Sequence, residues 1–448
     1  MSVPPLAGPG GWVRRLPFFY GWIVVAVAFV TMGVGVNART SFSLLFPPIL
    51  DEFGWASGET AAIFSLGFVA AMLYGPFLGA AIDRFGVRRV LAAGALTISA
   101  GLALATEASQ LWQLYLTFGL MVVGGSITVS YIGHSMFLPN WFQRRRGLAI
   151  GLAFSGAGVV GIVLFPALQA LMDRDGWRQA CWLLAGLMLL VVLPLNLLLQ
   201  RQRPEELGLA VDGDGRTEAA SRPTIDNVVD AEWAAVDWTL KRAMHTGRFW
   251  WLFAGMASGL FAWYAIQVHQ TRYLLEVGID REAAAAALGL VVFTGIAGQI
   301  VLGHLSDRIG REWVWSLSAG GFALAALLLL ALRHQPGALL LYGMVGAQGL
   351  LGYGISALYA AMPAELFQGR RFATIYGVLS LAASLGAAAG PWITGLVYDR
   401  TGGYDLAFWL CVAVSLFCML CGWMAAPRKV RLVAGQAARR HAAGSGGG

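Results

Sequence analysis

Charged residues are scarce in this sequence. Asp, Glu, Lys and Arg make up only 12% of its 448 residues, whereas about 25% is usual for a soluble globular protein. Hydrophobic residues make up 58%, and the mean hydropathy is +0.66. So few charges cannot solvate most of the surface of a chain this long. The composition therefore argues against a soluble enzyme and predicts a protein surrounded by lipid.

Cysteines and the motifs of common enzyme classes are equally sparse. All four cysteines lie inside apolar runs, where they are interpreted as small buried side chains: Cys181, Cys411, Cys418 and Cys421. The sequence contains no P-loop and no His-Glu-x-x-His motif. The net charge of +7 is spread over the short gaps between apolar runs. We therefore expect no enzyme activity, no cofactor, no metal and no nucleic-acid partner.

Long apolar runs dominate what is present. Each has about the 20 residues that a transmembrane helix needs, and the alternation of a β-barrel is absent. The runs cover 18–47, 58–82, 90–107, 110–138, 147–172, 177–200, 248–274, 283–306, 312–333, 337–364, 371–398 and 404–426. The sequence therefore predicts an all-α membrane protein with twelve transmembrane helices, numbered here as spans 1 to 12.

A short charged motif occurs twice. Gly79-x3-Asp83-Arg84-x-Gly86 lies between spans 2 and 3, and a related stretch with Asp307-Arg308 lies between spans 8 and 9. Asp307 follows Asp83 by half the length of the chain, a separation that we call the half-chain offset, and Pro363 follows Pro139 by the same offset. Several matches at one offset indicate a duplication into two pseudo-symmetric six-helix bundles.

These patterns divide the chain into five regions. We expect an N-terminal tail at 1–17, a six-helix bundle at 18–200, a polar linker at 201–247, a second bundle at 248–426 and a C-terminal tail at 427–448. The first part of the linker, from Pro204 to Asp226, has the composition of a flexible segment. Beyond it, the spacing of Trp233, Val236, Leu240 and Met244 predicts one amphipathic helix at the membrane interface.

The distribution of positive charge predicts the orientation. Most of the 31 Lys and Arg residues fall on the side that holds both termini, including the run Arg144-Arg145-Arg146. Cytoplasmic loops carry such an excess of positive charge. We therefore expect a multi-pass protein of a bacterial-type cytoplasmic (inner) membrane, monomeric, with both termini in the cytoplasm.

Two motifs resemble a known family. The stretch from Gly79 to Arg89 resembles the cytoplasmic loop signature of the major facilitator superfamily. The run from Asn140 to Gly158, with its aromatic pair, basic triplet and small residues, looks like the fifth-span signature of monocarboxylate transporters and of the bacterial oxalate:formate antiporter group. The resemblance covers essentially the whole chain. It implies a secondary transporter that works by alternating access.

The resemblance also implies two sets of site residues. The gate that closes the cytoplasmic side would comprise Gly79, Asp83, Arg84, Gly86, Arg88, Arg145, Asp307 and Arg308. Spans 1, 4, 7 and 10 would line a central cavity. Its substrate-binding candidates are Arg39, Asn37, Tyr131, His269, Arg272, Gln299 and Tyr359, and its proton-coupling candidates are His269 and His134. Arg39 in span 1 would neutralise a substrate carboxylate, because a guanidinium binds a carboxylate through two hydrogen bonds.

The sequence departs from the family pattern in span 8. Many relatives carry an Asp–Arg pair in span 8, or an Arg in span 8 with a Lys in span 11, but the stretches from Leu290 to Gln299 and from Gly377 to Pro391 have no charge. Proton symport and exchange therefore both stay open. The favoured substrate is a small organic anion, most simply a monocarboxylate. The alternatives are an exporter of hydrophobic compounds on the same fold, and a membrane sensor that transports nothing.

Overall fold

A computed structural model describes residues 13, 16–55, 57–213 and 227–445. The predicted tail at 1–17 and the segment 214–226 of the predicted linker lie largely or wholly outside these residues, as do 446–448. Over the described residues, twelve helical segments are long and apolar enough to cross a membrane, which confirms the predicted all-α fold.

Six spans form the first half of the molecule. They are α1 (Gly21–Thr40) continued by α2 (Phe42–Phe53), α3 (Ser57–Phe85), α4 (Val87–Ala105), a discontinuous span 4 (Leu111–Asn140), α7 (Arg146–Asp175), and α8 (Trp177–Leu187) continued to α9 (Leu193–Leu198). The second half comprises α12 (Gly247–Glu276), α13 (Arg281–Ile309), α14 (Arg311–Leu332), a discontinuous span 10 (Ala338–Leu366), α17 (Phe372–Thr401) and α18 (Asp405–Ala425).

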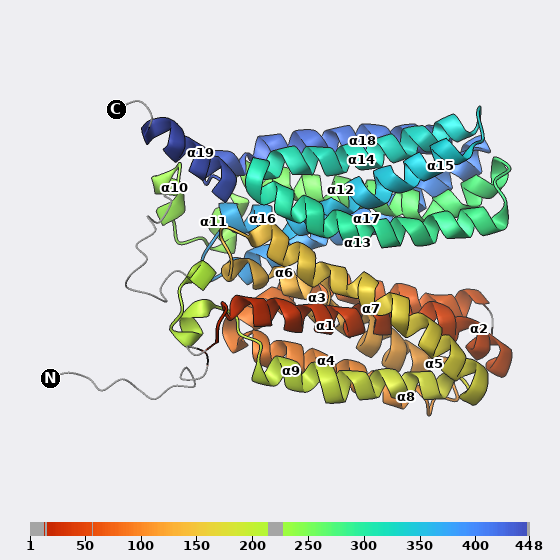
Figure 1. The fold of residues 1–448 in the computed structure, drawn as a ribbon. Coiled ribbons are helices and arrows are strands. Elements are labelled where there is room, and N and C mark those ends of the chain that lie inside the picture. Colours follow the sequence, from red (N-terminus) through yellow and green to blue (C-terminus); the bar gives the residue numbers. More distant parts are fainter. Residues whose placement is uncertain (1–12, 14–15, 56, 214–226, 446–448) are drawn as a thin grey trace.

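The two halves lie side by side with their helices roughly parallel (Figure 1). Both α1 and α12 begin at the end of the bundle that carries the short helices α10, α11 and α19; we call it the linker end. The opposite end is called the far end. Each half has a buried apolar core of its own. The four cysteines are free and buried, as expected for small apolar side chains.

The duplicated motif makes the same turn twice. Gly86 links α3 to α4 with φ +81°, and Gly310 links α13 to α14 with φ +118°. These two glycines are separated by the half-chain offset. A side chain is strained at such φ values, so a glycine at each position permits the tight reversal between consecutive spans.

Spans 4 and 10 are irregular at matching places. In span 4, a π-helical segment (Tyr115–Gly124) and a 3₁₀ turn (Gly125–Val129) precede a break at Ser130. In span 10, the same order occurs at Gly346–Leu351 and Gly352–Gly354. Irregular backbone at membrane depth is tolerated where it is buried in protein or lines a cavity, and π-segments are frequent at functional sites. The pair therefore indicates where a site lies.

The linker forms two short helices, α10 (Ala231–Ala235) and α11 (Leu240–Met244), in place of one. The chain leaves the helical conformation at Val236, whose ψ is 127°, so the predicted continuous helix is wrong in this respect. The linker and the C-terminal segment meet at a bridge between Val228 and Arg431, and α19 (Ala434–Ser445) follows. Both segments therefore cover the linker end.

Candidate functional site

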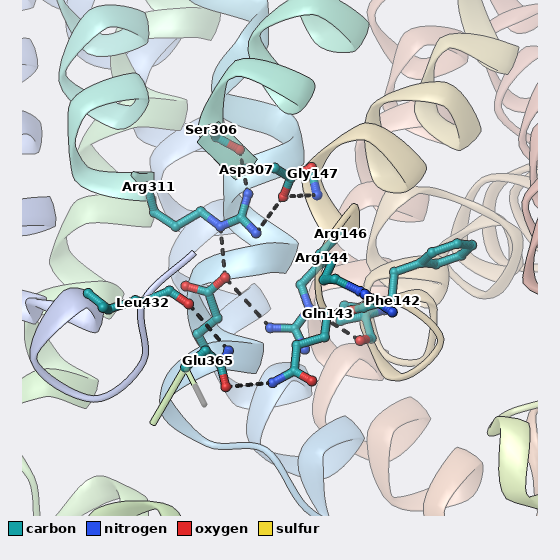
Figure 2. Close-up of polar contacts among 12 residues, drawn as sticks. Phe142, Gln143, Arg144, Arg146, Gly147, Ser306, Asp307, Arg311, Glu365 and Leu432 are labelled. Carbon is teal, nitrogen blue, oxygen red and sulfur yellow. Dashed lines mark hydrogen bonds and ion pairs between the residues drawn. The ribbon is translucent and has the colours of Figure 1, made fainter. Parts of the chain in front are cut away.

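Two aspartates join the halves at the linker end. Asp83, at the end of α3, accepts hydrogen bonds from the backbone N–H (2.9 Å) and hydroxyl (2.7 Å) of Thr374. Asp307, at the end of α13, accepts from the backbone N–H groups of Gly147 (2.9 Å) and Leu148 (3.0 Å) (Figure 2). Each carboxylate thus meets the first turn of a helix from the other half. Negative charge is stabilised there by the helix dipole.

A buried charge network surrounds Asp307 (Figure 2). Arg311 contacts Asp307 at 2.8 Å and donates from Nε to Glu365 at 2.8 Å. Arg146, from the other half, lies 3.7 Å from the same Glu365 oxygen. These side chains are at most 6% exposed. We call these four residues the clamp. Two arginines and two carboxylates balance, as buried charges require.

The C-terminal segment adds to the clamp. Arg431 faces Glu365, and its burial lowers the pKa of its guanidinium while the carboxylate opposes that change. Gln436 donates to the carbonyl of Ile309 at the end of α13 (2.8 Å). Gln143 donates to Asn227 of the linker (2.8 Å). The clamp is therefore covered by segments that belong to neither bundle.

The helices that meet at the linker end approach closely. A Cβ atom at Gly79 of α3 would lie 2.2 Å from the carbonyl oxygen of Ala373 in α17. At Gly147 of α7 it would lie 2.1 Å from the carbonyl oxygen of Gly303 in α13. No side chain fits at such distances, so these glycines permit backbone contact between the halves.

The remaining expected gate residues lie elsewhere. Arg84 stacks on Phe85, Arg88 donates to the carbonyl of Leu197 in its own half, and Arg145 is exposed. The side chain of Arg308 is exposed as well, and its carbonyl accepts from Arg439. The structure thus brings Gly79, Asp83 and Asp307 to the contact between halves, together with Arg146 and Glu365, which the sequence analysis did not select.

A second group of polar residues lies midway along the bundle. Arg39 is half-buried, and its guanidinium lies 5.2 Å from the ring centre of Phe68. It is within electrostatic range of Tyr131 in span 4, and Tyr264 of α12 is within the same range of Tyr131. Tyr353, in the irregular part of span 10, is within range of both of these tyrosines. Spans 1, 4, 7 and 10 therefore each contribute at least one side chain to the same group of residues.

Two glutamines and a tryptophan extend this group in the second half. The amide oxygen of Gln267 accepts hydrogen bonds from Gln348 (3.0 Å) and from the hydroxyl of Tyr353 (3.2 Å). The ring of Trp263 packs on that of Tyr353, with centroids 4.2 Å apart. Together with Arg39, Tyr131 and Tyr264, these four residues form what we call the central cluster.

The acidic residues of the spans lie near the ends of the spans, away from the central cluster. Each Asp and Glu of the twelve spans is within the first or last three residues of its span. Among the Lys and Arg residues of the spans, Arg39 lies deepest, and no carboxylate of the described residues pairs with it. The central cluster therefore has one positive charge and no fixed negative charge. An isolated intramembrane cation is costly, which makes it a functional-site candidate.

Two candidates in the lining occupy packed positions. Asn37 is buried and donates to the carbonyl groups of Gly33 (2.6 Å) and Ala157 (2.8 Å), so it ties α1 to α7. Gln299 is also buried, in α13, and its backbone carbonyl adjoins Gly151 of α7. Both lie at contacts between helices.

Tyr359 and His134 are enclosed by their surroundings. Tyr359 packs on Trp315 and adjoins Gly259, inside the second half. His134 is fully buried, and its Nδ1 donates to the carbonyl of Ser130 (3.0 Å), while its Nε2 has no partner among the described residues. That carbonyl belongs to the residue at which span 4 breaks.

His269 and Arg272 lie nearer the far end of α12. The two ring nitrogens of His269 contact the hydroxyl of Tyr404 (3.1 Å) and the carbonyl of Pro391 (3.0 Å). Arg272 is exposed and pairs with Glu276 (3.1 Å) over the ring of Tyr398. The side-chain partners of these two residues therefore belong to α12, α17 and Tyr404, and none of these partners is in the central cluster.

Sequence reasoning missed five residues of the central cluster: Trp263, Tyr264, Gln267, Gln348 and Tyr353. The repeat contained a signal for one of them, because Trp263 follows Arg39 by the half-chain offset. Residues 269 and 272 were selected in α12 because they are a histidine and an arginine. They lie one to two turns farther along the helix. The type of a residue did not show how far along the transmembrane helix, and so how deep in the membrane, its side chain lies.

Comparisons with known proteins agree with this architecture. The family model of the Major Facilitator Superfamily matches residues 21–293 and 271–444. Monocarboxylate transporter 11 from Homo sapiens is 30% identical over 418 residues, which cover 91% of this chain and 82% of that protein. Monocarboxylate transporter 3 from Rattus norvegicus is 30% identical over 420 residues, covering 90% and 78%.

Solved structures share the fold at lower identity. The transporter FucP in its outward conformation superposes with a TM-score of 0.69 at 14% identity, covering 91% of this chain and 99% of that one. The proton:xylose symporter XylE gives a TM-score of 0.68 at 14% identity, covering 90% and 95%. The matched family model, the relatives and the twelve-span architecture show that this chain belongs to the Major Facilitator Superfamily, with monocarboxylate transporters among its relatives.

Proposed function

We propose that the protein is a secondary transporter that moves an organic anion, most simply a monocarboxylate, across a cytoplasmic membrane. The observation that carries the proposal is Arg39, the single fixed positive charge of the central cluster, which pairs with no described carboxylate. A guanidinium in that position would hold a substrate carboxylate through two hydrogen bonds. The names of the relatives support the same substrate class.

The proposed cycle is alternating access. The linker end, taken as cytoplasmic, is shut in this conformation by Asp83, Asp307 and the clamp. Opening that side requires both aspartates to leave the helix N-termini of the opposite half. The substrate carboxylate at Arg39 would then be released to the cytoplasm or taken up from it as the halves rock.

We assign proton coupling to His134 ahead of His269. Both ring nitrogens of His269 are engaged, whereas Nε2 of His134 has no partner among the described residues. If protons drive transport, uptake driven by an imposed pH gradient falls in His134→Gln to the rate measured without a gradient, and persists in His269→Gln. Gradient dependence that is unchanged in His134→Gln would overturn this assignment.

The test of the main proposal is uptake by proteoliposomes. We expect labelled monocarboxylates to enter, and Arg39→Gln to reduce uptake at subsaturating substrate at least about tenfold, because a charge-assisted hydrogen bond is lost. Arg400→Gln is the matched control, since Arg400 is an exposed arginine near the far end. Undiminished uptake by Arg39→Gln, or a substrate range of neutral hydrophobic compounds that ignores Arg39, would refute the proposal and favour an exporter.

A further inference from the structure

The residues of the central cluster indicate the shape of the substrate as well as its charge. We propose that the site selects an aryl monocarboxylate: a planar aromatic body with one carboxylate and no ammonium group. This inference rests on the proposed function and adds the shape of the body to it. The carboxylate would bind Arg39 in the first half, and the ring would pack on Trp263 and Tyr353 in the second half.

The charge balance limits the substrate to a single negative charge. Arg39 is the deep cation, and acidic residues occur only within three residues of the span ends. A second carboxylate would have no cation beside it, and an ammonium group would have no carboxylate. Leaving either charge unpaired in a desolvated site is costly. Dicarboxylates and amino acids should therefore be poor substrates.

Aromatic rings lie beside Arg39 and Tyr131 in the first half, and a second group of rings packs around Trp263 in the second half. Phe68 lies against its guanidinium, and Tyr131 packs edge-on against Phe154 at 5.0 Å. In the second half, Trp263 packs against Tyr353 and also lies 5.5 Å from Phe322. Trp263 and Tyr131 are half-buried, so part of each ring is accessible.

The duplication makes this ring the counterpart of the cation in the second half. Trp263 occupies in the second half the sequence position that Arg39 occupies in the first, because the half-chain offset separates the two residues. The equivalent points of the two halves therefore differ in chemistry: one attracts a carboxylate and the other presents an indole face. A substrate that bridges the halves would need a charged end and an aromatic end.

Gln267 supplies a polar contact beside the indole. Its amide oxygen is used by Gln348 and Tyr353, and no described residue accepts a hydrogen bond from its amide nitrogen. The side chain is half-buried. Its N–H groups are thus available to a hydroxyl or carbonyl substituent on the substrate ring. We therefore expect ring-hydroxylated acids to bind at least as well as unsubstituted ones.

The experiment compares matched acids in proteoliposomes. Phenylacetate is set against acetate, against cyclohexylacetate of similar size, against the dianion phenylmalonate and against zwitterionic phenylalanine. We expect phenylacetate to be preferred over acetate at least about tenfold, from the apolar area buried. Over cyclohexylacetate we expect about a fivefold preference, since aromatic pairs gain beyond area alone.

Substitution of the indole tests the assignment to residues. Trp263→Leu should remove most of the preference for phenylacetate over cyclohexylacetate, and Trp263→Phe should retain it. Trp313→Leu is the control, because Trp313 is 57% exposed near the linker end. Thermal unfolding of each variant shows whether it is folded, and Trp263→Phe keeps the test informative if Trp263→Leu is not.

The outcomes separate the two proposals. If acetate and phenylacetate are carried equally well and both depend on Arg39, the aryl selectivity is wrong while the transport function holds. The aryl selectivity is also wrong if folded Trp263→Leu keeps the wild-type preference, or if folded Trp263→Phe loses it. If no monocarboxylate is transported, or if transport does not depend on Arg39, the proposed function itself is wrong.

Discussion

At the scale of the residue, Glu365 contributes most to the contact between halves, because it pairs with arginines of both. Glu365→Gln removes its charge and leaves Arg146 and Arg311 facing each other with Asp307 alone to balance them. Breaking a buried ion pair in this way costs about 3–5 kcal/mol. We expect a clear fall in the midpoint of thermal unfolding of the purified protein.

Glu52→Gln is the matched control for this change. Glu52 pairs with Arg178 at 2.7 Å, but both side chains are more than a third exposed. Pairs of this kind contribute about 0–1 kcal/mol. Equal losses of stability in Glu365→Gln and Glu52→Gln would show that the clamp does not bear on stability.

The site residues that could be identified from the sequence are those that belong to a recognisable motif. Asp83 and Asp307 were found from the duplicated loop, because a carboxylate at a span end needs a partner. Their partners could not be found, since they are backbone N–H groups of the other half. Arg145 was selected in place of Arg146 because the start of α7 decides which of three consecutive arginines faces inward, and that start was not known to one residue.

At the scale of the element, the close contact of α3 with α17 depends on Gly79. Gly79→Ala would place a Cβ 2.2 Å from a backbone carbonyl, so α3 and α17 must separate at the linker end. We expect slower transport and greater labelling of the linker end by a water-soluble thiol reagent at Thr374→Cys. Gly186→Ala is the control, because no atom lies within 4 Å of the added Cβ. Unchanged labelling in Gly79→Ala would contradict this interpretation.

The long spans were predictable as elements and the breaks within them were not. Apolar length alone placed span 11 at 371–398, and the helix runs from Phe372 to Thr401. The interruption of span 4 at Ser130 was not predicted, because the serines and threonine around it, Ser126, Thr128 and Ser130, also occur within regular transmembrane helices. In the linker, Trp233 and Leu240 had helical spacing, yet the chain leaves the helix between them.

At the scale of the whole molecule, the half-chain offset predicted two equivalent halves, and the two aspartate contacts at the linker end follow that symmetry. The clamp does not, because the position equivalent to Glu365 in the first half is Trp141. The two contacts between halves therefore differ in composition: one includes a buried charge network and the other does not have its Glu365. This asymmetry arises from side chains that a repeat of short motifs cannot reveal.

The proposed rocking of the halves predicts that locking the linker end stops transport. A Cβ at Gly75 of α3 would lie 2.7 Å from the hydroxyl of Ser380 in α17, so Gly75→Cys with Ser380→Cys should form a disulfide between the halves. Oxidation should abolish uptake, and a reducing agent should restore it. The single variant Gly75→Cys is the control, because it carries the same added side chain and can form no bond with position 380. If the oxidised variant with Gly75→Cys and Ser380→Cys still takes up substrate, separation of the halves at the linker end is not part of the cycle, because the disulfide would hold α3 against α17 throughout.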